Sequence, residues 1–144
     1  MYIVTGGAGF IGSNLVHGLE RRGHIDTVVC DVLGTGDKWR NLAKREFETI
    51  ISPDELFSFL DRYVDQIPVI FHMGAISTTT ETDVDAILRN NIRLSQDLWH
   101  WCARHQKRFI YASSAATYGS GENGFEDNEE ISALEKLRPL NAYG

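Results

Sequence analysis

Over residues 2–12 the chain reads YIVTGGAGFIG, a short apolar run that leads through a glycine-rich turn into an amphipathic pattern. Glycines at positions 6, 9 and 12 allow a tight turn, a close approach to a phosphate and packing of a helix against a strand. Free N–H groups and the positive dipole at the start of that helix favour a pyrophosphate. This spacing alone is a weak signal, so the rest of the chain must supply the context of a dinucleotide site.

The composition is that of one soluble globular domain. The chain has 144 residues, of which 42% are hydrophobic and 24% charged, and its formal net charge is −6. The acidic balance argues against a nucleic-acid-binding surface, and no apolar run approaches the roughly 18 residues of a membrane span. Cys30 and Cys102 sit in apolar patterns without CxxC spacing, and no secretory signal precedes the first strand. We therefore expect buried free thiols, no metal site and a cytoplasmic protein.

Apolar runs and helical periodicities alternate along the chain. Short buried strands are expected at 2–5, 27–30, 47–51, 69–72 and 109–112, and helices at 10–22, from 52 towards 67, and at 83–105. Ser52, Pro53 and Glu55 form a capping box with proline at the first helical position. Residues 120–135 are polar and acidic and are expected to form a surface loop.

This alternation predicts a Rossmann-like α/β fold, a doubly wound parallel sheet covered on both faces. Right-handed crossovers give the strand order 3-2-1-4-5. A ligand crevice is then expected at the carboxyl ends of the first and fourth strands, beside the glycine turn.

Two charged residues near the second strand bear on the choice of cofactor. Asp31 stands 19 residues after Gly12, where an acidic side chain accepts hydrogen bonds from the adenosine ribose of NAD. Lys38 is either a cation for the 2′-phosphate of NADP or a solvated loop lysine. The choice between NAD and NADP stays open.

Small and polar residues follow the fourth strand, where they would let the chain pass beside a cofactor. His72 is expected to be a satisfied, partly buried histidine. Thr79 and Glu81 either contact a polar substrate or cap the next helix. Asn90 and Asn91 are unusual in a helix, since asparagine is a poor helix former. An amide that faces the site, or that bridges backbone groups there, would explain one of them.

A serine pair and a tyrosine form the candidate catalytic group. Ser113 and Ser114 follow the fifth strand, and Tyr143 lies near Gly144. Tyrosine ionises at about pH 10, so it serves as a general base only beside positive charge such as a lysine and an oxidised nicotinamide. Removing a hydride from a sugar carbinol requires such a proton acceptor on the same oxygen. Taken singly, each of these residues fits a strand-end turn or a surface position equally well.

Together these stretches resemble a known family. The chain is similar to the extended short-chain dehydrogenase/reductases that act on nucleotide sugars in TGGAGFIG (5–12), Asp31, SSAATYG (113–119) and NAYG (141–144). In HMGAISTTTE (72–81) and YASSAATYG (111–119) it resembles more narrowly the branch that epimerises an ADP-linked heptose. The resemblance implies bound NADP or NAD, oxidation of the heptose C6 hydroxyl, and return of the hydride to the opposite face. It also implies a homo-oligomer that serves lipopolysaccharide inner-core synthesis. The composition already argues against a nucleic-acid or membrane partner.

The resemblance also assigns roles to particular positions. Ser114 corresponds to the substrate-orienting serine and Tyr143 to the acid/base tyrosine. Thr79 and Glu81, from their polar groups at the crevice edge, are candidate contacts to the ADP-heptose substrate. The positions expected to hold the cofactor are Gly6, Gly9, Phe10, Ile11, Gly12, Asp31, Val32, Lys38, Met73, Gly74, Ala75, Ile76, Ser77 and Asn90.

The chain departs from the family pattern in two ways. Val32 and Pro53 stand where members often carry a small polar residue and a lysine, which weakens the NADP assignment. The pattern Tyr-x-x-x-Lys would place a lysine at position 147. We therefore expect residues 1–144 to be a cofactor-binding domain without the substrate domain, inactive as an epimerase by itself.

Two other functions fit parts of the sequence. One is a UDP-sugar 4-epimerase or a related nucleotide-sugar oxidoreductase. A dehydratase is disfavoured because Ala115 and Ala116 occupy places where those enzymes usually carry acidic residues. The other is a non-catalytic dinucleotide-sensing module, which would keep the glycine turn but tend to lose Ser114 and Tyr143.

Overall fold

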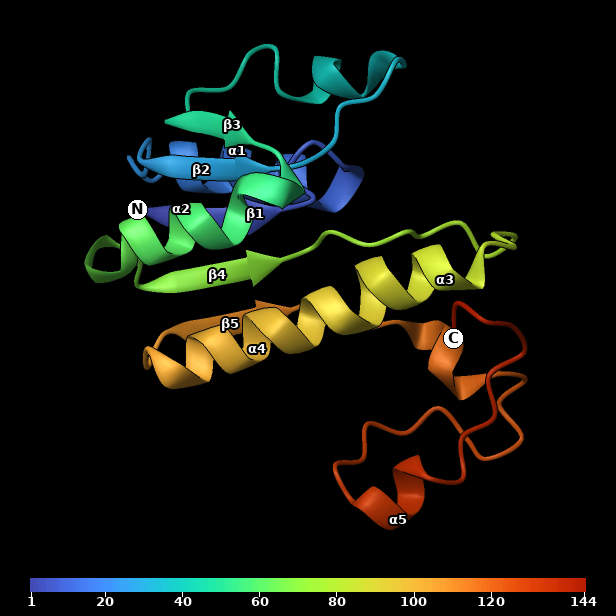
Figure 1. Ribbon diagram of the computed structural model, residues 1–144. Coiled ribbons are helices and arrows are strands. Elements are labelled where there is room, and N and C mark those ends of the chain that lie inside the picture. The colour runs from blue at the N-terminus through green and yellow to red at the C-terminus, as the bar shows by residue number, and fades with distance from the viewer.

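A computed structural model describes residues 1–144, and its centre is a five-stranded parallel sheet in the order β3-β2-β1-β4-β5 (Figure 1). The strands are β1 (Tyr2–Thr5), β2 (Thr27–Cys30), β3 (Thr49–Ile51), β4 (Val69–His72) and β5 (Arg108–Tyr111). The predicted fold class and strand order are confirmed. Each strand begins and ends within two residues of its expected position.

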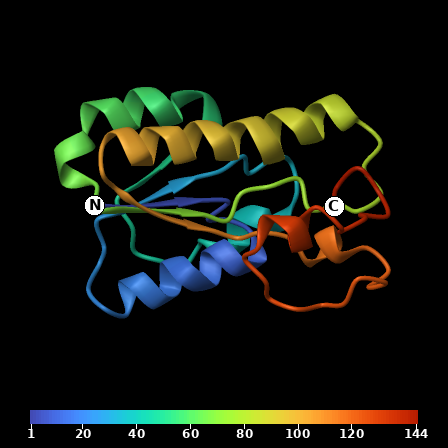
Figure 2. The same cartoon turned by 90° about the horizontal axis from the view of Figure 1, so that it is seen from below.

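Helices cover both faces of this sheet. The α-helices are α1 (Phe10–Glu20), α2 (Leu56–Arg62), α3 (Val84–Ile87), α4 (Leu94–Arg104) and α5 (Ile131–Leu134). The 3₁₀ turns are η1 (Asp37–Asn41), η2 (Pro53–Glu55), η3 (Val64–Gln66) and η5 (Ala115–Tyr118), and η4 (Leu88–Arg93) is π-helical. Figure 2 shows α2 (green) and α4 (orange) on one face and α1 (blue) on the other. None of the helices combines the length and apolar character needed to cross a bilayer.

Two apolar cores lie on the two faces because successive strand residues point in opposite directions. Ile3 and Val28 face α2 and α4, where they join a cluster that includes Leu60. Val4 and Val29 face α1 in a second cluster. Strands β1 and β2 are buried almost throughout, as expected for parallel strands covered on both sides.

Local signals set the helix boundaries. The Glu55 carboxylate accepts hydrogen bonds from the Ser52 N–H and hydroxyl, both at 2.8 Å, so the predicted capping box is present. Its first turn is the 3₁₀ turn η2 rather than α-helix. Helix α1 ends at Glu20, two residues earlier than predicted, and Gly23 then reverses the chain with φ +81°.

Two elements differ from the prediction. The helix expected over 83–105 is interrupted by the π-helical η4, so it consists of three segments. The prediction of a loop over 120–135 was wrong at its end, because residues 131–134 form the short helix α5. Its sequence ISAL can close a turn locally, and the Glu135 N–H donates to the Ile131 carbonyl at 2.9 Å.

Both cysteines are buried free thiols, as predicted. Burial raises the pKa of Cys30 to about 12 and that of Cys102 to about 11. Both thiols are therefore protonated and unreactive at neutral pH.

Candidate active site

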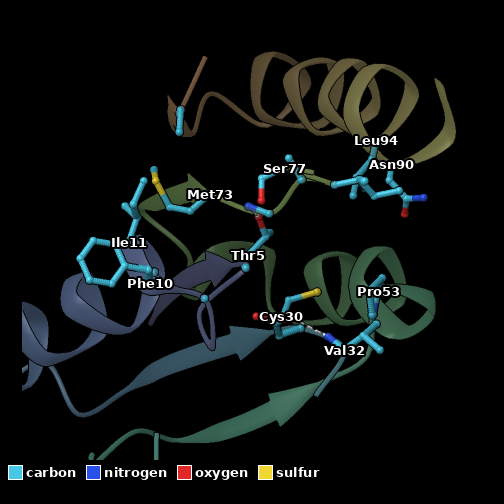
Figure 3. Close-up of a pocket in the computed structure, with 18 of the residues that line it drawn as sticks. Thr5, Phe10, Ile11, Cys30, Val32, Pro53, Met73, Ser77, Asn90 and Leu94 are labelled. Carbon is cyan, nitrogen blue, oxygen red and sulfur yellow. Dashed lines mark hydrogen bonds between the residues drawn. The ribbon is translucent and has the colours of Figure 1, made fainter. Parts of the chain in front are cut away.

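A cavity of about 520 Å³ opens at the carboxyl ends of the strands, where the strand order reverses between β1 and β4. Figure 3 shows Phe10 and Ile11 on one side of it, Val32 and Pro53 on another, and Asn90 on the π-helical segment η4. Every residue expected to hold a cofactor lines this cavity, as does Tyr143. Its volume falls within the range of small-molecule sites, which is about 300–1,000 Å³.

Six further residues line the cavity, although the sequence did not predict that they would hold the cofactor. They are Thr5, Cys30, Pro53, Leu94, Ala112 and Ser113. Thr5, Cys30 and Ala112 end a strand or directly follow one. Since ligands bind outside the carboxyl ends of parallel strands, the strand boundaries alone could have identified these three.

The turn that forms this site has room only for glycine at positions 6 and 12. Gly6 has φ +65°, and a Cβ there would lie 2.6 Å from Gly74 Cα. A Cβ on Gly12 would overlap the Gly6 carbonyl oxygen. No side chain caps the start of α1 and its first turn holds no acidic residue, so the first N–H groups of the helix are left for an anion. This cradle fits a dinucleotide pyrophosphate.

Asp31 fixes the glycine turn against the end of β2. Its Oδ2 accepts a hydrogen bond from the Ala8 N–H at 2.8 Å, while Asn41 Nδ2 donates to the Ala8 carbonyl at 2.8 Å. Asp31 Oδ1 accepts from the Val32 N–H at 2.7 Å and from Lys38 Nζ at 2.5 Å. The Asp31 side chain is only 6% exposed and that of Lys38 is 38% exposed. Lys38 is thus paired with Asp31 at the cavity, an arrangement that neither expected role included.

His72, the last residue of β4, is a structural residue that does not line the cavity. His72 is 1% exposed, with Nδ1 2.6 Å from Thr5 Oγ1 and Nε2 2.9 Å from Ser95 Oγ. Burial lowers the pKa of His72 to about 4, so the ring is neutral at pH 7. The prediction of a satisfied histidine is confirmed, although the ring is fully rather than partly buried.

The two candidate substrate contacts lie outside the cavity lining. Thr79 is exposed, and the Glu81 carboxylate accepts hydrogen bonds from the N–H groups of Thr82 and Asp83, both at 2.8 Å. Asp83 in turn caps α3. Of the two roles considered for Glu81, the contacts in this structure are those of a residue that shapes the start of the next helix.

The two asparagines of η4 have separate roles. Asn91 bridges the backbone of Ile76, accepting from its N–H at 2.8 Å and donating to its carbonyl at 2.9 Å. Asn90 lines the cavity, and its amide donates to the Ala86 carbonyl at 2.8 Å. The expected backbone bridge is therefore present. In the π-helical turn, Asn91 binds the Ile76 backbone while the adjacent Asn90 lines the cavity.

The candidate catalytic residues lie on two segments that pack together. Ser114 Oγ accepts a hydrogen bond from the Ala116 N–H at 3.1 Å and caps η5, and the residue that lines the cavity is Ser113. Tyr143 lines the cavity from the far end of the chain. A Cβ on Gly144 would lie 2.6 Å from the Ala116 carbonyl oxygen, so the tyrosine segment is in close contact with the serine turn. No group of three His, Cys, Asp or Glu side chains could hold a metal ion.

The chain matches known sequences along its length. The sequence model of the NAD dependent epimerase/dehydratase family matches residues 2–144. The chain is 47% identical to an ADP-L-glycero-D-manno-heptose-6-epimerase of Fusobacterium nucleatum and 45% identical to one of Nitratidesulfovibrio vulgaris. Each match covers 100% of this chain but only 44% and 45% of those two proteins. The chain thus spans less than half the length of the curated relatives it matches.

Solved structures share the fold. UDP-glucuronic acid 4-epimerase from Bacillus cereus, solved with NAD, matches with a TM-score of 0.74 and 28% identity over 99% of this chain and 47% of that one. The WbmG enzyme of Bordetella bronchiseptica, solved with NAD and UDP, matches with a TM-score of 0.75 over 99% of this chain and 45% of that one. At 22% identity, this second likeness concerns the fold alone.

Proposed function

Because the chain belongs to the NAD dependent epimerase/dehydratase family, we propose that it is the cofactor-binding part of an ADP-heptose 6-epimerase. The reaction would convert ADP-D-glycero-D-manno-heptose into ADP-L-glycero-D-manno-heptose, a precursor of the lipopolysaccharide inner core. The observation that carries the proposal is the single cavity that the glycine turn, Asp31 and Tyr143 line together. The two relatives at 45–47% identity support the choice of the heptose.

The residues present fit a nicotinamide dinucleotide, NADP or NAD, and we favour NAD. The start of α1 would receive the pyrophosphate, and the carboxyl end of β2 with Asp31 would receive the adenosine ribose. Lys38, the cation at this corner of the cavity, is already neutralised by Asp31, and Val32 and Pro53 add no charge. A 2′-phosphate would therefore find no net positive charge here. When bound, the dinucleotide supplies the acceptor and donor of the hydride.

The residues of the chain would manage the proton and the substrate oxygen. Tyr143, as phenolate, would take the proton of the C6 hydroxyl while the C–H electron pair leaves as hydride, so that C6 becomes a ketone. Tyr143 would return that proton when the hydride comes back on the opposite face. Ser114 or Ser113 would hold the oxygen in place. Ser114 corresponds to the family serine, and a rotation of its hydroxyl away from the Ala116 N–H would be needed to free it.

A second candidate is epimerisation at C4 of a UDP-sugar. The likeness to UDP-glucuronic acid 4-epimerase, at 28% identity, favours it. A non-catalytic sensing module is the weaker alternative, because Tyr143 lines the cavity and its segment packs against the serine turn. We also expect a cytoplasmic homo-oligomer, as the family resemblance implies.

The decisive experiment assays the native protein that carries this chain. Its bound nucleotide is released and identified by mass, and it is then incubated with ADP-D-glycero-D-manno-heptose or, as the matched control, UDP-galactose. We expect NAD and a C6-inverted product only from the heptose, detected by NMR. Inversion of UDP-galactose alone would replace the heptose proposal with the C4 reaction. Residues 1–144 alone are expected to bind the cofactor weakly and to show no turnover, since the relatives extend well beyond them.

A further inference from the structure

We propose that His72 is a positioning residue for the active-site cavity. A directed chain of hydrogen bonds through its ring holds two parts of the wall, the loop after β4 and the π-helical turn η4. His72 does not itself line the cavity. The inference rests on the function proposed above in one respect only, that this cavity binds a nicotinamide dinucleotide.

The direction of each hydrogen bond follows from the number of protons available. Ser95 Oγ donates its one proton to the Asn91 carbonyl at 2.7 Å. It must therefore accept at its contact with His72, which places the ring proton on Nε2. Nδ1 of His72 then carries no proton and accepts from Thr5 Oγ1 at 2.6 Å. Thr5 Oγ1 in turn accepts from the Gly74 N–H at 3.1 Å.

The chain of donors therefore runs without a break from Gly74 through Thr5, His72 and Ser95 to Asn91. Every member has its partner, and only one neutral tautomer of His72 satisfies all of them. The ring also stacks on Tyr111, with centroids 5.6 Å apart. The bond between Thr5 and His72 is buried and the other three are partly buried, so losing any of them breaks a chain in which every polar group is paired.

Both ends of this chain reach the cavity wall. At one end Gly74 lies against the glycine turn, so closely that a Cβ on Gly6 would be 2.6 Å from Gly74 Cα. At the other end Ser95 fixes the Asn91 backbone, and the Asn91 side chain holds both polar backbone groups of Ile76. Gly74 and Ile76 both line the cavity. One buried ring thus sets the spacing between two lining residues without touching a ligand.

The test compares cofactor affinity with stability in the native protein. Ser95→Ala removes the acceptor of His72 Nε2 and the donor to Asn91 while α4 keeps its course. We expect its Kd for NAD to rise about tenfold, because both hydrogen bonds of the Ser95 hydroxyl are lost. The matched control is Cys102→Ala, because Cys102 is a buried residue of the same helix that lies outside the chain of bonds. We expect this control to lower the unfolding temperature without changing the Kd. A Ser95→Ala Kd within twofold of the native value would overturn the proposal.

A spectroscopic readout checks the mechanism separately. Two-bond ¹H–¹⁵N correlations of the His72 ring at neutral pH are expected to show the proton on Nε2. A proton on Nδ1 would contradict the directed chain even if affinity falls. If the native protein binds NAD but does not invert ADP-heptose, the proposed reaction fails and this inference stands. If it binds neither NAD nor NADP, both fail.

Discussion

The two sides of the cavity are built in different ways. On the β1–β2 side, buried strands, the close approach of Gly6 to Gly74 and the Asp31 carboxylate fix the backbone. On the β5 side the strand is largely exposed, with Ile110 at 47% and Tyr111 at 49%, and Ser114 and Tyr143 are carried by a turn and a terminal segment. The β1–β2 side, where we propose that the cofactor binds, is therefore fixed by local packing, whereas Ser114 and Tyr143 on the proposed catalytic side belong to segments outside the sheet.

Tyr143→Phe is the strongest test of that separation. If the phenol moves the proton of the substrate, its removal is expected to lower kcat about 10³-fold. Because the binding side is built from other segments, the Kd for NAD is expected to change by less than about threefold. Steady-state kinetics and titration of the native protein measure the two effects. A parallel loss of NAD binding would show that the two sides are not separable.

Gly12→Ala tests the binding side. The added Cβ would overlap the Gly6 carbonyl oxygen, so the turn must open, and we expect NAD binding to weaken by about 100-fold. Gly36→Ala is the control, because a Cβ there meets nothing within 4 Å. Calorimetric titration of both variants gives the two affinities. Equal affinities would mean that the turn tolerates a side chain.

The pH dependence of stability is expected to report His72. Its pKa is about 4 in the fold against 6.5 when unfolded, so the unfolded chain binds the extra proton between these values. The free energy of unfolding therefore falls as the pH is lowered from 6.5 towards 4, by up to about 3 kcal/mol. Denaturant titrations across this window measure the slope. His72→Gln is expected to flatten it, and an unchanged slope in that variant would assign the effect elsewhere.

Lys38→Met gives the smallest expected effect and bears on cofactor choice. It removes the partner of Asp31, so the uncompensated carboxylate would repel a 2′-phosphate and weaken NADP binding by about fivefold, with little change for NAD. Arg40→Met is the control, because its ion pair with Asp37 is exposed. Competition between the two dinucleotides measures the ratio. A larger loss of affinity for NAD than for NADP would contradict the conclusion that Asp31 neutralises the charge of Lys38 at the cavity.

The sequence predicted most of what the backbone determines. The short apolar runs located each strand, and parallel topology then brought distant residues such as Gly6, Asp31 and Asn90 to one cavity. This succeeds because strand ends follow from local pattern and their convergence follows from the fold class.

Side-chain pairing was less accessible from the sequence. The Lys38–Asp31 pair and the turn in which Ser114 accepts from Ala116 depend on torsions that no spacing rule specifies. The π-helical turn was equally hidden, since its one visible sign was two asparagines in a helix. The Asn91 amide explains one of these asparagines. It pairs with the backbone N–H and carbonyl of Ile76, which lies outside any helix or strand.

The two hydrogen bonds that hold the Ala8 backbone have a kinetic consequence. Asp31 and Asn41 hold its N–H and its carbonyl before any ligand arrives, so the turn is already in its binding geometry. Little ordering is then left for the association step, and the encounter needs no slow rearrangement of the turn. We expect a single fast binding phase whose rate rises linearly with NAD concentration and does not level off at a conformational limit.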